Sequence, residues 1–182
     1  MQLSVTLRNA LLDALETATG ASPRLRMLTG AQPANCAASQ TGALLEEMAL
    51  PADWMAASAS GVKSLLGSWT GTADAGGLAG YFRITDAAGT TCHWQGLLSQ
   101  PWAASTAYLL NQQVNLGGNV YRCTTAGTSA SSGGPTGTGA SIADGTAVWT
   151  YLGPVDMVLD NGNLAPGQTV QVTAFTLTAP NA

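Results

Sequence analysis

Charged side chains are scarce in this sequence: Asp, Glu, Lys and Arg make up 9% of its 182 residues, against about a quarter in an average globular protein. Only six residues are Lys or Arg, and they do not cluster. Because nucleic-acid binding needs a basic face that displaces counterions, we expect no nucleic acid among the partners. With a net charge of −4 and a mean hydropathy of +0.15, self-repulsion contributes little to solubility. Such chains are often covered by neighbours in an oligomer or a larger assembly.

Long apolar runs are also absent. No stretch of about 18 apolar residues is present, so we expect no membrane insertion. Residues 1–20 have no basic amino end, and Arg8, Asp13 and Glu16 interrupt their apolar pattern, which is unlike a secretory signal peptide. We therefore expect the chain to mature in the cytoplasm of the cell that makes it.

Histidine and cysteine, the residues that most often carry catalysis or bind metals, are few. His93 is the only histidine and follows Cys92 directly. Neighbouring residues of a strand point to opposite faces, so this pair is a poor nucleophile and base. The odd cysteine count, with Cys36 and Cys123 distant in sequence, favours free thiols. We expect neither a metal site nor a cofactor.

The carboxylates offer no convincing catalytic pair. Glu46 and Glu47 are adjacent in an expected strand and face opposite ways. Asp156 and Asp160 flank an expected strand and a turn. Residues 160–163 supply some oxygen atoms for calcium, but their Asp-Asn-Gly-Asn sequence is explained as well by turn chemistry. The sequence therefore predicts a protein that is not an enzyme.

Hydrophobic periodicity predicts one helix followed by strands. Leucines recur every four residues from Leu3 to Leu15, which predicts a helix over residues 4–19 with Ser4 as its N-cap and Gly20 as its stop. The period then falls to two, which is typical of strands. We expect strands at 24–28, 43–50, 54–59, 64–70, 78–85, 90–95, 155–159 and 169–178. Their short, regular spacing predicts a mainly β protein whose host domain is an antiparallel β-sandwich or jelly roll.

Residues 100–153 differ in composition from the rest. They hold only two charged side chains, Arg122 and Asp144, in a frame rich in Gly, Ser and Thr. Aromatic residues are nevertheless spaced along them, unlike in a disordered linker. The strand pattern that precedes this segment resumes after it, so we expect a small β-rich module inserted at a loop tip of a discontinuous host domain, residues 1–99 plus 154–182.

The inserted segment resembles the small chitin-binding-type carbohydrate-binding modules that accompany glycosidases. The resemblance is carried by Trp102 and a Tyr six residues on, a valine strand, the turn at residues 117–119, a Tyr strand, Gly134-Pro135 and a closing Trp. With its loop at residues 127–130 the segment is also similar to modules inserted in bacteriophage virion proteins. It departs from the glycosidase modules after Cys123, where a run of Thr, Gly and Ser replaces an aromatic segment.

The resemblance implies glycan binding through aromatic rings, which stack on the apolar face of a sugar. The candidate glycan-binding residues are Trp102, Tyr108, Tyr121, Trp149 and Tyr151. The alternative is that the rings form the core of the module, which has little else to bury.

The host segments resemble a family of small tailed-bacteriophage and prophage proteins, through residues 24–34, 42–45, 79–86 and 163–177. This implies a virion structural protein, assembled in the cytoplasm of a bacterial host. We expect a capsid decoration or cement protein whose partners are capsid or other virion proteins, further copies of itself and cell-surface glycans. The alternative is a tail, neck or baseplate component whose insert binds glycans of the host envelope. The expected absence of a signal peptide disfavours a third class, an accessory module of a secreted glycan-processing enzyme.

Overall fold

The helix predicted at the amino end is present and is capped as its sequence predicts. In the computed structural model, which describes residues 2–180, helix α1 spans Val5–Thr19. The Ser4 side chain accepts a hydrogen bond from the backbone N–H of Leu7. Gly20 has a φ of 88° and donates its N–H back into the last turn. Glycine adopts this φ without steric cost, so the helix ends there.

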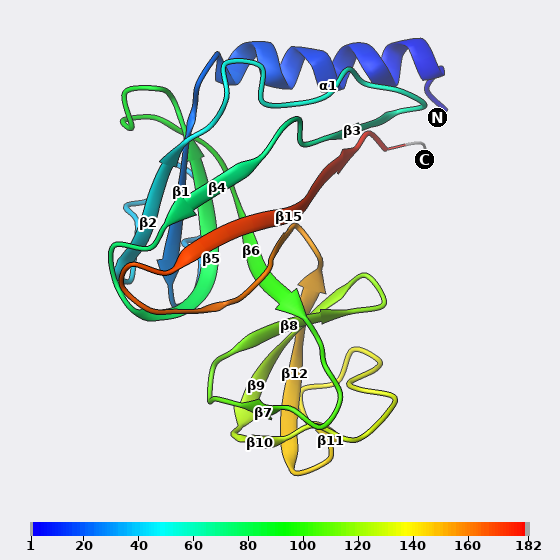
Figure 1. The fold of residues 1–182 in the computed structure, drawn as a ribbon. Coiled ribbons are helices and arrows are strands. Elements are labelled where there is room, and N and C mark those ends of the chain that lie inside the picture. The colour runs from blue at the N-terminus through cyan, green and yellow to red at the C-terminus, as the bar shows by residue number, and fades with distance from the viewer. Residues whose placement is uncertain (1, 181–182) are drawn as a thin grey trace.

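The protein is mainly β, as predicted. Four neighbouring antiparallel strands form a first layer below α1 (Figure 1). In spatial order they are β2 (Leu44–Ala49), β1 (Arg24–Thr29), β5 (Gly77–Thr85) and β6 (Cys92–Pro101). The two-residue strand β14 (Asn163–Leu164) pairs with the start of β5.

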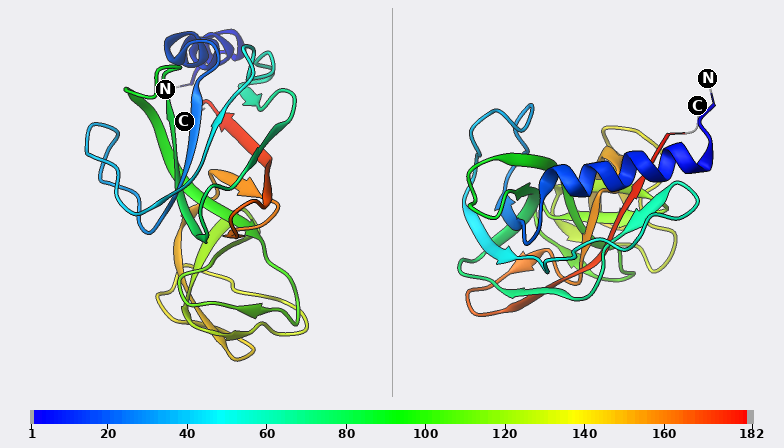
Figure 2. Two further views of the ribbon diagram at one scale, coloured as in Figure 1. Left: turned by 60° about the vertical axis from the view of Figure 1, so that its left-hand side comes forward. Right: turned by 90° about the horizontal axis from the view of Figure 1, so that it is seen from above.

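A second layer is built around the long carboxy-terminal strand. Strand β15 (Thr169–Thr178) pairs with β4 (Trp69–Thr72), β3 (Val62–Ser64) and β13 (Met157–Leu159), all antiparallel. Figure 2 shows this layer crossing the first, with α1 lying over the end that they share. The two layers bury one hydrophobic core between them, which gives the sandwich-like arrangement.

Aromatic side chains connect the two layers through this core. Trp69 lies 5.9 Å from Trp54 and 5.5 Å from Phe175, measured between ring centroids. Phe175 in turn meets Phe82 of the first layer edge-on at 5.8 Å. Large rings in such tilted contacts supply much of the buried apolar area of a small domain.

Strand β5 is buried on both faces. The face opposite the core is covered by the segment from residue 30 to 43, which contacts Tyr81 and Arg83. The Tyr81 hydroxyl donates to the carbonyl of Thr41 over 2.6 Å. The Arg83 guanidinium donates to the carbonyls of Cys36 and Ala38, each at 2.8 Å. Carbonyl oxygens thus bind one guanidinium nitrogen of a buried cation that forms no ion pair among residues 2–180, while its Nε stays without a partner.

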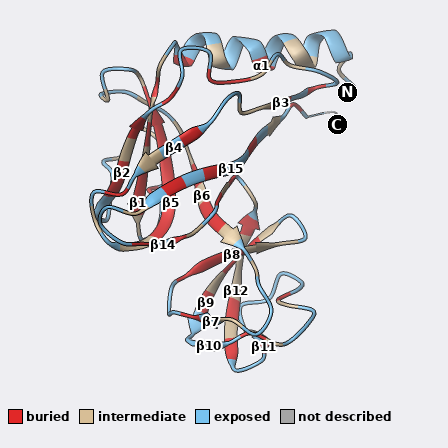
Figure 3. Ribbon diagram, in the orientation of Figure 1, coloured by how far each residue is buried: buried red, intermediate tan, exposed pale blue. Residues whose placement is uncertain are grey.

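The inserted segment forms a small lobe (residues 102–154) at the end of the molecule opposite α1 (Figure 1). Its strands are β7 (Ala107–Tyr108), β8 (Gln113–Leu116), β9 (Asn119–Thr125), β10 (Gly127–Thr128), β11 (Ile142–Asp144) and β12 (Ala147–Pro154). Its buried residues form a hydrophobic cluster separate from the sandwich core. Figure 3 shows these two buried regions, one in each part of the molecule.

Strand β6 joins the two parts. Its first half pairs with β5, and its end pairs in parallel with β8 of the small lobe, Gln100 opposite Val114. Strand β13, which follows the lobe in sequence, returns beside β6 with Met157 opposite Leu98. The expected adjacency of the chain segments before and after the insert is therefore present. Because β6 and β12 run through residues 100 and 153, the lobe continues the sheet of the host.

Three details of the predicted fold are wrong. Residues 54–59 form no strand and make only isolated bridges at Met55 and Ala59. The strand predicted at 64–70 is two strands, because the chain turns between Ser64 and Trp69. The sheet is mixed and not purely antiparallel, since β6 pairs in parallel with both β13 and β8.

Helix α1 contacts the sandwich mainly through its polar residues. The Lys63 ammonium of β3, with a side chain only 3% exposed, lies 2.8 Å from both the Asp13 and the Glu16 carboxylates of the helix. Arg8 donates to the carbonyl of Ala179 over 2.9 Å. Of the apolar helix residues, only Leu12 is fully buried. The pKa of Lys63 is raised, because the two carboxylates outweigh the cost of burial.

Removal of the small lobe tests whether the sandwich core is independent. Pro101 and Pro154 lie on strands three neighbours apart, which is about 14 Å. We therefore expect that a Gly/Ser bridge of about six residues can replace residues 102–154. Because the sandwich core keeps all its members, the shortened chain should unfold in one cooperative transition in circular dichroism. A non-cooperative melt would contradict this.

Lys63→Met should destabilise the attachment of α1. It leaves two carboxylates without their cation, which we expect to cost about 3 kcal/mol of unfolding free energy, measured by urea denaturation. Hydrogen exchange should locate the loss in α1. The matched control is Arg24→Met, which breaks a pair whose Arg side chain is 40% exposed and should cost under about 1 kcal/mol. Equal losses in the two variants would show that the contacts of Lys63 with Asp13 and Glu16 do not hold α1 on the sandwich.

The contact between Lys63 and Asp13 also predicts an acid dependence. The hydrogen bond from Lys63 lowers the pKa of Asp13. A lowered pKa contributes stability that is present above the unfolded value of about 3.9 and is lost as the pH falls through the folded one. The difference in helix exchange between the wild type and Lys63→Met should therefore shrink below about pH 4. A constant difference down to pH 2 would contradict it.

Candidate functional site

Three of the five aromatic residues proposed for glycan binding form the core of the small lobe. Tyr108, Tyr121 and Trp149 come from β7, β9 and β12, and each is at most 2% exposed. Tyr108 meets Trp149 edge-on, with 4.9 Å between the ring centroids. The two tyrosine hydroxyls bond to backbone carbonyls of Ala103 and Gly137. A buried ring offers no face to a sugar, so the glycan role is wrong for these three.

The other two rings are half-buried at the edge of that core. Trp102 packs beneath the Gly-rich loop, so closely that a Cβ on Gly134 would lie 2.9 Å from its ring. Tyr151 packs edge-on against Tyr121 at 6.0 Å. These two rings keep some exposed surface. Glycan binding by Trp102 and Tyr151 stays a prediction.

Asp144 organises the lobe from its centre. Its Oδ2 accepts hydrogen bonds from the indole N–H groups of Trp102 at 2.8 Å and Trp149 at 3.2 Å. Its Oδ1 accepts the backbone N–H of Ala130 at 2.9 Å. One buried carboxylate thus fixes both tryptophans and the loop after β10. Sequence reasoning misses this role of Asp144, although a lone carboxylate in a nearly uncharged segment requires hydrogen-bond donors when it is buried.

Sequence reasoning also missed an exposed apolar corner. Leu109 and Leu110, in the turn after β7, are 50% and 54% exposed. The next residue, Asn111, has a φ of 71°, a conformation that Asn tolerates better than most residues. The sequence Leu-Leu-Asn contains neither Gly nor Pro, the strongest turn residues. The sequence therefore does not predict a turn at this position.

The thiols and the histidine lie apart from any catalytic arrangement in the described part of the chain. All three cysteines are free. Burial, and then a hydrogen bond with Cys36, raise the pKa of Cys92 to about 11, so this thiol stays protonated at neutral pH. The His93 side chain follows it on the exposed side of β6.

Two of the carboxylates singled out in the sequence, Glu47 and Asp160, have structural partners. Glu47 bonds to Arg24 and Arg26, which hold its pKa below the usual range despite some burial. Burial, with the charge of Asp74 nearby, raises the pKa of its neighbour Glu46. The Oδ1 of Asp160 accepts the N–H of Gln171, as a turn residue would. Among residues 2–180 no group of three metal-ligating side chains converges.

Comparison with protein-family models, with curated proteins and with solved structures found no match to this chain. Within the described residues, no helix has the length and apolar character needed to cross a membrane. The function must therefore be argued from the geometry of the molecule itself.

Asp144→Ala should melt the small lobe selectively. The change leaves three N–H groups without their acceptor, at a cost of about 3 kcal/mol or more. We expect a red shift of tryptophan fluorescence and a separate, lower calorimetric transition. Asp144→Asn, which keeps one acceptor oxygen, should fall between the alanine variant and the wild type. A wild-type melting curve for Asp144→Ala would show that the carboxylate does not organise the lobe.

Proposed function

We propose that this protein is a non-enzymatic structural subunit of a bacteriophage virion, a capsid decoration or cement protein. The observation that carries the proposal is the orientation of helix α1. Its charged residues Arg8, Asp13 and Glu16 bond to the sandwich, whereas three of its four leucines are exposed and only Leu12 is buried. An amphipathic helix normally does the reverse. The exposed leucines are therefore best explained as a contact for a neighbouring subunit.

The outward leucines form one continuous apolar surface. Leu7, Leu11 and Leu15, four residues apart on one flank of α1, are 47%, 44% and 41% exposed. Beside them is a groove of about 330 Å³, which Trp94 and Leu177 also line. Exposed apolar patches of this kind mark interaction sites in soluble proteins. We call the surface made by Leu7, Leu11, Leu15, Trp94 and Leu177 the leucine face.

The leucine face and the small lobe lie at opposite ends of the molecule (Figure 1). A subunit that docks through α1 would therefore hold the lobe away from the surface to which it is bound. Many copies on one particle would convert weak binding by each lobe into useful avidity. This arrangement suits display on a capsid, and it also suits a tail, neck or baseplate position.

Immunogold labelling of phage particles from the producing strain, with antibody against this chain, tests the location. Dense label over the heads would support a shell protein. Label confined to the neck or the tail end would instead support a tail, neck or baseplate component whose lobe binds glycans of the host envelope. Particles without label would contradict the virion hypothesis.

Leu11→Lys should abolish docking without unfolding the protein. The residue is exposed, so we expect the unfolding free energy to change by less than about 0.5 kcal/mol. A charge in the centre of the leucine face should reduce the number of copies per particle at least about tenfold, because it would be desolvated on docking. The matched control, Thr6→Lys, is exposed on the other flank of α1 and should leave the copy number unchanged. Quantitative blotting of purified particles measures both.

A further inference from the structure

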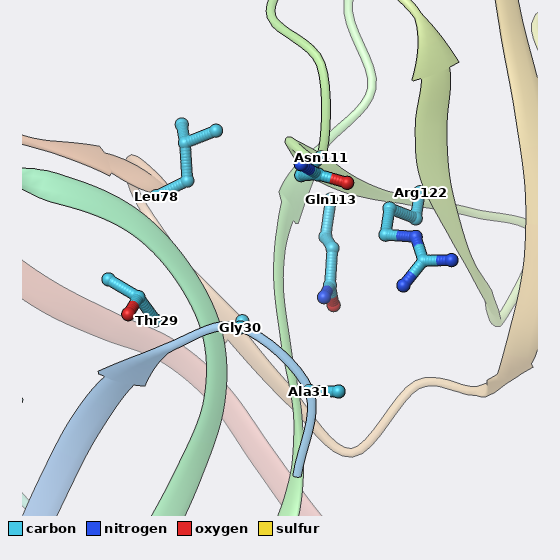
Figure 4. A pocket seen from close by; sticks show the side chains of 8 residues that line it. Thr29, Gly30, Ala31, Leu78, Asn111, Gln113 and Arg122 are labelled. Carbon is cyan, nitrogen blue, oxygen red and sulfur yellow. The ribbon is translucent and has the colours of Figure 1, made fainter. Parts of the chain in front are cut away.

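A pocket with three polar side chains on its lobe side lies at the junction of the sandwich and the small lobe. It has a volume of about 360 Å³, within the range of sites for small ligands. Thr29, Gly30, Ala31, Leu78 and Gly80 line it from the sandwich, and Asn111, Gln113 and Arg122 line it from the lobe. Figure 4 shows the amide of Gln113 pointing toward the segment of Gly30 and Ala31, with the Arg122 guanidinium beside it.

Gln113 and Arg122 are placed together by strand pairing. They are directly opposite each other on β8 and β9, so their side chains emerge on the same face of the sheet. On the opposite wall of the pocket, the backbones of Gly30 and Gly80 lie in close contact. A Cβ on Gly80 would lie 2.0 Å from the carbonyl oxygen of Gly30, which means that no larger residue fits there.

The two polar groups have no partner within the described protein. Gln113 is only 6% exposed, and its Oε1 is buried without a hydrogen bond. The Nε of Arg122 is likewise buried and unbonded, and no carboxylate lies within salt-bridge distance of its guanidinium. Buried polar groups are almost always satisfied in folded proteins. Both side chains line the pocket, and their unsatisfied atoms, an acceptor and a cationic donor, point to a ligand as the missing partner.

The chemistry of the pocket defines that ligand. Arg122 is the only charged residue among the eight that line it, and a guanidinium binds carboxylates through paired N–H donors. The Gln113 amide and the Asn111 side chain suit hydroxyl groups, which both donate and accept hydrogen bonds. The volume admits one ring of sugar size. A phosphate ester is a poorer fit, since Arg122 would face its larger charge alone.

We propose that this junction pocket binds a sugar acid, with the carboxylate on Arg122 and a hydroxyl on the Gln113 amide. The proposal names the class of ligand that a lobe displayed on a virion would bind, and to that extent it rests on the proposed function. The binding itself does not depend on where the protein is located. Labelling of particles and binding by purified protein can therefore fail separately.

Isothermal titration of the purified full chain with glucuronate, galacturonate and a galacturonate disaccharide tests the proposal. Glucose and galactose, which lack the carboxylate, are the matched controls. We expect the acids to bind and the neutral sugars to bind at least about tenfold more weakly. Tighter binding of the disaccharide would indicate the acid unit of a glycan chain, and equal binding would indicate the free monosaccharide. No binding of any acid would overturn the proposal.

Variants assign the site within the molecule. Arg122→Met should weaken acid binding at least about tenfold, whereas Arg24→Met, at a partly exposed arginine that does not line the pocket, should leave it unchanged. Gln113→Met should also weaken binding and should raise the melting temperature of the ligand-free protein, because it removes an unsatisfied buried amide. A purely structural Gln113 would instead lower that temperature when replaced.

Ala31→Phe provides a variant that keeps both polar groups. Ala31 is exposed at the rim, so a larger side chain should fill the pocket without disturbing the core. We expect it to abolish binding while the melting temperature stays within about 2 °C of the wild type. Undiminished acid binding in both Ala31→Phe and Arg122→Met would place the ligand elsewhere and overturn the assignment.

Discussion

Strand β6 is the constraint on which the rest of the structure depends. Over ten residues it pairs with β5 in the sandwich, then with β13, and at its end with β8 of the small lobe. Hydrogen bonds along one extended segment therefore fix both cores relative to each other. A lobe on a flexible linker would have no defined wall facing the sandwich, whereas this one shares a pocket with it. Because the walls are preformed, a ligand would lose little free energy to ordering the protein.

Much of the fold could be predicted because periodicity and turn residues report local structure. The helix with its caps at Ser4 and Gly20, and the strands around residues 24–28, 78–85 and 169–178, agree with their patterns. The predicted strand at 54–59 is wrong because Trp54 and Met55 are buried by tertiary packing and do not belong to a paired strand. Parallel pairing of β6 could not be predicted, since nothing in a strand's own sequence specifies which distant strand it will meet.

The candidate site could be predicted only in part, for a related reason. Aromatic residues in a Gly-rich frame mark a small folded unit, but spacing alone does not distinguish a ring in a core from a ring on a surface. Trp149 and Tyr121 lie inside because a lobe with few aliphatic residues has little else to bury. The pairing of Gln113 with Arg122 depends on the β8–β9 register. The direction of the leucines of α1 depends on Lys63, fifty residues away in sequence.

The bond from Arg8 to the carbonyl of Ala179 has a practical consequence. It brings the two ends of the described chain together beside α1 (Figures 1 and 2). A peptide or fluorescent protein fused to either end would emerge next to the leucine face and would compete with a docking partner for space. The loop between β10 and β11, exposed over residues 136–141 and far from α1, is the better insertion point for an epitope.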